Sequence, residues 1–222
     1  MTTDITVRGQ ARDVRDPDRA VLHLRAYAEA RDWGAAHAAV SAAIATLNAS
    51  VDALKAAHPG ALERLSIGQA YQGNWTRDGA QLFTETVRVT ARFTDFAAMS
   101  AWAFANTNAD VRLQYVEWEL SPALADAIRQ QLGQAAIKDA RDRATTFAGA
   151  AGLKIIAVQA LADPGLLPGL TPAANGSGPV PRMRGASLMA VGGAAPANEQ
   201  VIDLTPEPIE TLAAVEAHFL AE

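Results

Sequence analysis

Residues 121–153, SPALADAIRQQLGQAAIKDARDRATTFAGAAGL, decide how the rest of this chain is organised. The stretch predicts one long helix, because Ser121 is a suitable N-cap and Pro122 stands at the first helical position, where a missing N–H costs nothing. Gly152 supplies the stop. One face is apolar at helical spacing and rich in alanine: Leu124, Ile128, Leu132, Ala136, Ala140, Ala144 and Ala148. Such small side chains predict close approach to a sheet or another helix.

Two kinds of periodicity alternate along the chain before and after this helix. Apolar residues that alternate with polar ones predict strands near 5–9, 20–27, 65–71, 82–93 and 111–120, and β-branched content predicts a further strand at 154–161. Helical spacing predicts a helix from Trp33 to Leu54, ended by a His-Pro-Gly sequence, and a short helix over 96–102. Residues 74–79 are expected to form a turn.

The closing segment, 209–220, fits two structures. Its Ala, Leu and Glu content favours a helix by intrinsic preference. Two prolines precede it, however, and Ile209, Val215 and Phe219 share one face only at a period of two residues. We therefore predict a strand that pairs within the main sheet.

The resulting order is ββα-ββα-β-α-β-β, which predicts an α+β fold with a mainly antiparallel sheet and the long Ala-rich helix packed on it. We expect a single domain over 1–222, with sub-units 1–110 and 111–222 as a second way to divide it. Residues 163–198 are dense in Gly and Pro, so they predict an irregular loop, with a short edge strand at 186–191 as an option within it.

Composition excludes several classes of function. The chain has 222 residues, half of them hydrophobic, which is enough to bury a core. A net charge of −5 argues against a nucleic-acid partner or an anionic membrane surface. The chain has no cysteine, which excludes disulfides and thiolate chemistry. The first residues lack the layout of a secretory signal and no apolar run has the length of a membrane span, so a cytoplasmic location is expected unless a leader was removed.

Four segments together resemble one protein family. They are ITVRGQARDVRDPDRAVLHL at 5–24, VEWELSP at 116–122, AAIKDARDRATTFAGAAGLKIIAV at 135–158 and LTPEPIETLAAVEAHFL at 204–220. In their order and spacing they look like the SIMPL-domain family, which includes a periplasmic immunogenic protein of bacteria. The resemblance implies an α+β fold and a tendency to form oligomers or rings. It also implies links to envelope or stress physiology and to kinase-associated signalling, and it offers no catalytic residues to carry over.

The sequence contains no recognisable catalytic or metal-binding motif. The four histidines are scattered, with no spacing typical of metal ligands, and no nucleophile motif or phosphate-binding loop occurs. We therefore assign no catalytic, metal or cofactor site. Trp75, in a predicted polar turn, is a candidate for an interaction surface, because exposed tryptophans are enriched at interfaces. Arg182 and Arg184, within the Gly/Pro-rich loop, are further candidates.

The leading hypothesis is a non-enzymatic SIMPL-like protein that forms a homo-oligomer and presents a loop surface to a protein partner. The rival is a small-molecule-binding protein or an enzyme with a pocket between the sheet and the long helix, since apolar pockets between layers are common binding sites.

Overall fold

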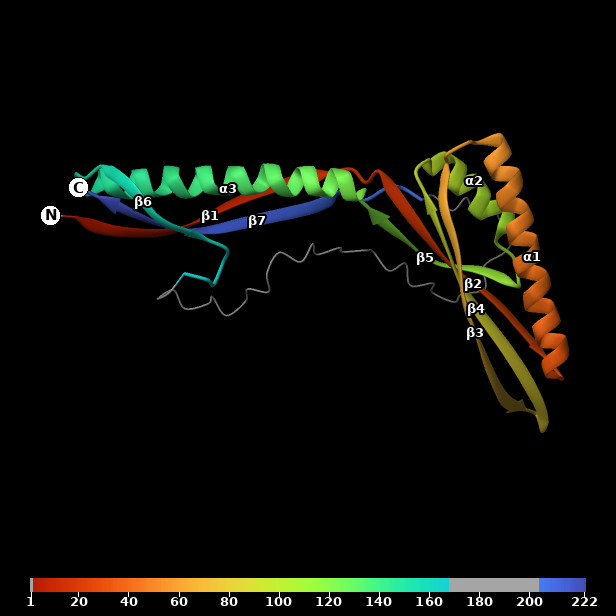
Figure 1. Cartoon of the computed structure of the whole chain (residues 1–222). Coiled ribbons are helices and arrows are strands. Elements are labelled where there is room, and N and C mark those ends of the chain that lie inside the picture. The colour runs from red at the N-terminus through yellow and green to blue at the C-terminus, as the bar shows by residue number, and fades with distance from the viewer. Residues whose placement is uncertain (1, 168–203) are drawn as a thin grey trace. The chain divides into compact units, whose positions relative to one another are not determined.

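The computed structural model describes residues 2–167 and 204–222 (Figure 1). The described chain forms two compact units, each with its own antiparallel sheet. The long-helix unit contains residues 2–16, 120–167 and 208–222, and the four-stranded unit contains residues 17–119 and 204–207.

The sheet of the long-helix unit has three strands in the order β1-β7-β6: β1 (Thr3–Arg15), β7 (Ile209–Ala221) and β6 (Ile155–Ala162). The central strand, β7, pairs with β1 over their whole length, from Thr3↔Ala221 to Arg15↔Ile209. The two ends of the chain therefore lie side by side, as the N and C labels in Figure 1 show. The closing segment is a strand, which confirms the prediction made from its period of two.

Helix α3 (Pro122–Ala150) packs lengthwise on this sheet. The hydroxyl of Ser121 accepts a hydrogen bond from the backbone N–H of Leu124, as expected of an N-cap. Gly152 adopts a φ of 74°, the left-handed conformation that ends helices. The buried residues of the helix fall on the predicted face: Ile128, Leu132, Ala136, Ala140, Ala144 and Ala148. The row of alanines brings the helix close to Val7 and Phe219 of the sheet.

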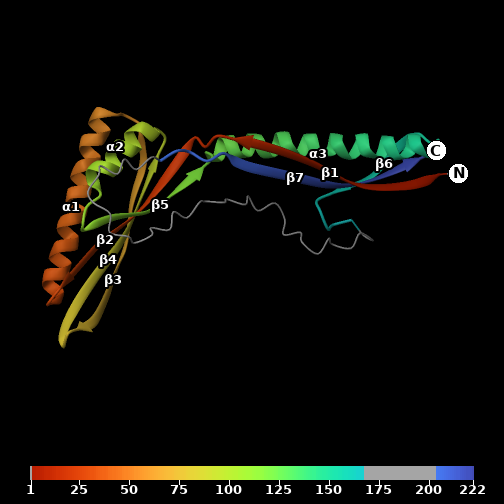
Figure 2. The same cartoon turned by 180° about the vertical axis from the view of Figure 1, so that it is seen from behind.

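The four-stranded unit has the order β2 (Arg19–Ala30), α1 (Trp33–Ala57), β3 (Leu62–Arg77), β4 (Ala80–Phe93), α2 (Phe96–Asn106) and β5 (Val111–Glu119). Its strands are arranged β3-β4-β2-β5, each antiparallel to its neighbours. This is the βαββαβ topology of ferredoxin-like folds. Both helices lie on the same face of the sheet, as seen from either side in Figures 1 and 2.

Apolar residues from the helices and from alternate positions of the strands build the core of this unit. The fully buried members include Leu22 and Leu24 of β2, Val89 and Phe93 of β4, and Met99 of α2. By length and composition alone α1 would qualify as a membrane-spanning helix. In the structure, its residues Val40, Leu47, Val51 and Leu54 are buried against the rest of this core.

The fold class and the order of elements are as predicted, but the strands form two sheets instead of one. The first strand does not pair with β2, the next strand in sequence; its partner is β7, near the other end of the chain. Sequence periodicity identifies a strand but carries no information about its partner. The turn expected at 74–79 is also shorter than predicted. Strand β3 continues to Arg77, and only Asp78 and Gly79, both with positive φ, connect it to β4.

Candidate interaction surface

The four-stranded sheet has one face covered by α1 and α2 and a second face, which we call the open face. Side chains alternate across a strand, so the residues between the core positions belong to the open face. They are mainly charged and aromatic: Arg25, Tyr27 and Glu29 of β2, Arg88 and Arg92 of β4, Arg112, Tyr115 and Glu117 of β5, and Arg64, Tyr71, Trp75 and Arg77 of β3.

Trp75 lies near the β3–β4 turn, within a strand and not in a loop. Its side chain is 39% exposed, and its indole N–H donates a hydrogen bond to Glu29 Oε2 at 3.0 Å. The Arg77 guanidinium stacks on the indole ring, 4.4 Å from its centroid, and lies 3.7 Å from Glu29. Trp75, Arg77 and Glu29 form what we call the hairpin surface. Its role as an interface remains a prediction.

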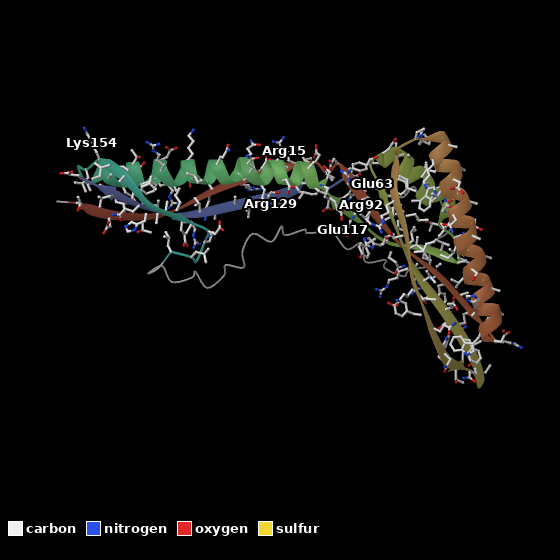
Figure 3. The ribbon with its side chains drawn as sticks, in the orientation of Figure 1. Arg15, Glu63, Arg92, Glu117, Arg129 and Lys154 are labelled. Carbon is white, nitrogen blue, oxygen red and sulfur yellow. The ribbon has the colours of Figure 1, made fainter. Side chains whose placement is uncertain are left out.

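The opposite end of the open face carries several ion pairs. Arg92 lies 3.2 Å from Glu119, and Arg19 donates to Glu63 at 2.8 Å. The hydrogen bond from Arg19 holds the pKa of Glu63 below its ordinary value. Figure 3 labels Glu63, Arg92 and Glu117 at this end. Positive and negative charges alternate here, which is typical of a solvated surface.

Each of three histidines is paired with one carboxylate. His23 lies 3.2 Å from Glu117 and stacks on the Tyr115 ring, with 4.1 Å between the centroids. On β7, His218 lies 3.3 Å from Asp4. The third, His37 of α1, contacts a buried carboxylate described next. Within residues 2–167 and 204–222, no group of three His, Asp or Glu residues is arranged to hold a metal ion.

Glu85 is a buried carboxylate on the helix-covered face of the four-stranded sheet. The side-chain amide of Gln72 donates to it at 3.0 Å, and His37 Nδ1 lies 3.0 Å from its other oxygen. The hydrogen bond from Gln72 is the main cause that lowers the pKa of Glu85; burial opposes it, and His37 adds to it. The carboxylate therefore stays charged at neutral pH.

Ser41 extends this cluster, because its hydroxyl lies 3.5 Å from His37 Nε2. A row of Ser, His and Glu has the order of a nucleophile, a base and an orienting acid. Ser41, however, lies inside α1, where backbone N–H groups bond to the preceding helical turn. These N–H groups therefore cannot form an oxyanion hole beside Ser41.

Glu216 is a second buried carboxylate, in β7 of the long-helix unit. Arg8 of β1 donates to it at 2.7 Å, and the backbone N–H of Gly165 donates at 3.0 Å. The Arg8 hydrogen bond is the main cause that lowers the pKa of Glu216; burial opposes it, and the Gly165 and Leu167 amides assist. The carboxylate thus fixes the segment that follows β6 against the sheet.

The two edge strands of the long-helix sheet differ sharply in charge. Strand β1 carries five charged residues, Asp4, Arg8, Arg12, Asp13 and Arg15, whereas β6, with the sequence IIAVQALA, carries none. Three large apolar side chains of β6 are about half exposed: Ile156 at 51%, Val158 at 53% and Leu161 at 48%. Charged side chains are a common protection of sheet edges, and β6 lacks that protection.

The remaining candidates from the sequence, Arg182 and Arg184, lie outside the described residues, as do the option of a strand at 186–191 and most of the 163–198 loop. Neither Glu85 nor Glu216 was singled out from the sequence. For Glu85 the available signal is its register with the core positions Val87 and Val89 of an alternating strand. Glu216 lies between the core positions Val215 and Ala217, on the other face of β7, so alternation does not mark it.

The family model SIMPL, described as "Protein of unknown function (DUF541)", matches residues 5–219. A comparison with curated proteins gives no match.

Proposed function

The chain belongs to the SIMPL family of proteins of unknown function, and from this premise we propose that it is a non-enzymatic protein that self-associates and presents a surface to a protein partner. The observation that carries the proposal is the uncharged, apolar edge strand β6.

Strand β6 is suited to pair with a second copy of itself. An edge strand presents a row of backbone N–H and C=O groups that a further strand can satisfy. Two β6 strands related by a two-fold axis would join antiparallel and extend the three-stranded sheet to six strands. The exposed apolar side chains at Ile156, Val158 and Leu161 would lose water in the same contact.

The hairpin surface is the proposed contact with a different protein. A tryptophan held by a hydrogen bond to Glu29 and by stacking with Arg77 is oriented before any partner arrives. Preorganised aromatic and arginine side chains are enriched among residues that dominate interface energetics. The loop surface around Arg182 and Arg184, expected from the sequence, lies outside the described residues.

Self-association is tested by the molar mass of the purified chain, measured by light scattering and native mass spectrometry across a range of concentrations. We expect an oligomer for the wild type and a lower mass for Val158→Lys, because a charge at the centre of β6 opposes edge pairing. Phe104→Lys is the matched control. Phe104 is 66% exposed on α2, in the other unit, and its replacement should leave the mass unchanged.

Two results would contradict the proposal. One is a monomeric wild type at all concentrations; the other is an equal drop in mass for both variants. A cooperative melting transition for Val158→Lys would establish that the variant is folded.

The rival hypothesis expects a ligand pocket between the sheet and the long helix. The contact between α3 and β1 does not support such a pocket. Gly9 and Ala140 are in direct contact there, which leaves no room for a ligand at that point. Native mass spectrometry addresses the rival as well, because a small molecule that copurifies with the chain would be read as added mass.

A further inference from the structure

Three arginines stand in a row across three neighbouring strands of the open face. Arg25 of β2 is paired with Arg88 of β4 on one side and with Arg112 of β5 on the other. Neighbouring strands lie about 4.8 Å apart, so the three side chains begin within about 10 Å of one another. We call these three residues the arginine row.

Like charges at directly opposed positions destabilise a sheet unless something neutralises them. Within residues 2–167 and 204–222, no carboxylate lies at ion-pair distance from any member of the arginine row. Arg25 packs on the Tyr27 ring, 4.9 Å from its centroid, and Arg88 lies 5.8 Å from the centroid of Tyr71. These ring contacts orient the guanidinium groups but leave their positive charge unpaired.

One nitrogen atom of the arginine row is an unsatisfied hydrogen-bond donor. Arg25 Nε is buried and has no hydrogen-bond acceptor among the described residues. A buried donor without an acceptor costs free energy, and such groups are rare in folded proteins. The arginine row therefore carries an unsatisfied donor in addition to its unpaired charge.

Negative charge is missing beside the arginine row but present at both ends of the open face. Towards one end of the open face Arg92 is paired with Glu119, and towards the other end Arg77 is close to Glu29. The positions next to the arginine row carry hydroxyl groups: Thr90 and Tyr115 are aligned with His23 on one side, and Tyr27, Thr86 and Tyr71 are aligned with each other on the other side. The positions that flank the row therefore carry hydroxyl groups and His23, and the carboxylates Glu29 and Glu117 contact two of them, Tyr27 and His23.

From this arrangement we propose that the arginine row is a binding site for a phosphate group. A guanidinium group offers a planar fork of N–H donors that matches the oxygens of a phosphate. A phosphate monoester carries up to two negative charges and three terminal oxygens, enough to accept from three arginines at once, whereas a carboxylate has one charge and two oxygens. No helix or strand of residues 17–119 covers the open face, so the phosphate can belong to a small soluble molecule or to a lipid headgroup. The acidic composition argues against a polynucleotide.

This proposal is independent of self-association, because it concerns residues of the other unit. Its failure would leave the assignment of β6 untouched, and loss of assembly in Val158→Lys would leave phosphate binding intact.

The test is a titration of the full chain, in a buffer without phosphate, with inorganic phosphate and pyrophosphate. Binding is followed by calorimetry and by the NMR signals of the arginine Nε–H groups. Lipid binding is followed by cosedimentation with phosphatidylcholine vesicles, with and without phosphatidic acid. We expect saturable binding that weakens at least about tenfold in Arg88→Gln and in Arg112→Gln, since each loses a charged hydrogen-bond donor. Arg64→Gln, on the same face but outside the row, should change affinity by less than about twofold.

Stability measurements separate a binding role from a structural one. Without phosphate, Arg112→Gln should melt at the wild-type temperature or higher, because it relieves repulsion between like charges. Phosphate should raise the melting temperature of the wild type and not that of Arg112→Gln. Binding of soluble phosphate or of phosphatidic acid alone would each support the site and identify its source. Absence of all binding, equal losses in Arg64→Gln, or binding only of a single-stranded oligonucleotide would overturn the proposal.

Discussion

Gly9 of β1 lies directly against Ala140 of α3: a Cβ atom built on Gly9 would stand 2.6 Å from the Ala140 backbone nitrogen and 2.7 Å from its Cβ. Real Cβ atoms do not approach other atoms so closely, and here the obstacle is helix backbone, which cannot move aside alone. The long helix and the first strand therefore meet at a position where only glycine fits.

We predict that Gly9→Ala lowers the free energy of unfolding by about 1–3 kcal/mol, because the added methyl group forces α3 away from the sheet. Gly133→Ala is the control. Gly133 lies within α3 with open space around it, so alanine should stabilise the protein by up to about 1 kcal/mol through helix propensity. Chemical denaturation of both variants measures the difference, and a neutral Gly9→Ala would show that the contact is looser than described.

The alanine row gives a second prediction. Ala144 is fully buried, so Ala144→Leu should overpack the contact with the sheet and cost about 1–3 kcal/mol. Arg141 is on the exposed side of the same helix, and Arg141→Leu should change stability by less than about 0.5 kcal/mol. Equal shifts of the melting temperature would mean that the helix packs through another face.

Deletion of residues 208–222 tests the central position of β7. Without that strand, β1 and β6 lose their shared partner and α3 loses one of the two strands that it mainly contacts. We expect the long-helix unit to unfold and the helical signal in circular dichroism to fall, whereas the four-stranded unit keeps its own melting transition. An unchanged melting curve would show that the segment is an appendage.

The two buried carboxylates predict a loss of stability in acid. Glu85 and Glu216 both have a folded-state pKa below the ordinary value of 4.5. Their stabilising contribution is therefore complete above that pH and is lost as the pH falls through the lower folded-state pKa. Glu216→Gln should cost about 1–3 kcal/mol at pH 7, because a charged acceptor for Arg8 is replaced by a neutral one.

The same variant supplies the check on this prediction. As the pH falls through the folded-state pKa, the wild-type carboxyl group becomes protonated and resembles the amide, so the difference between wild type and Glu216→Gln should shrink. Thermal melts of both proteins at a series of decreasing pH values measure it. A difference that does not depend on pH would mean that Glu216 contributes through packing and not through its charge.

Much of the fold follows from local patterns in the sequence. The cap at Ser121, the alanine spacing and the stop at Gly152 are all local signals, and the structure places α3 within a few residues of them. The closing strand also follows from its period of two. These features depend on the chain only a few residues away, which is why the sequence alone reveals them.

Features that depend on pairing could not be predicted in the same way. Arg25, Arg88 and Arg112 are visible in the sequence as single arginines between apolar residues, but they form a row only through the registers of two strand pairs. Trp75 was expected in a turn because Asn and Gly surround it. The two-residue connection at Asp78 and Gly79 allows the strand to extend further than composition suggests.

The pairing of β1 with β7 has a consequence for the order in which the protein folds during synthesis. The ribosome makes β1 before residues 16–208 and β7 after them, so β1 lacks its partner strand while those residues are being made. Residues 17–119 contain all the strands and helices of the four-stranded unit, and they leave the ribosome before β7 does. The four-stranded unit can therefore form before β1 is paired. Until β7 is made, the growing chain carries a long unpaired strand, which chaperones are suited to protect.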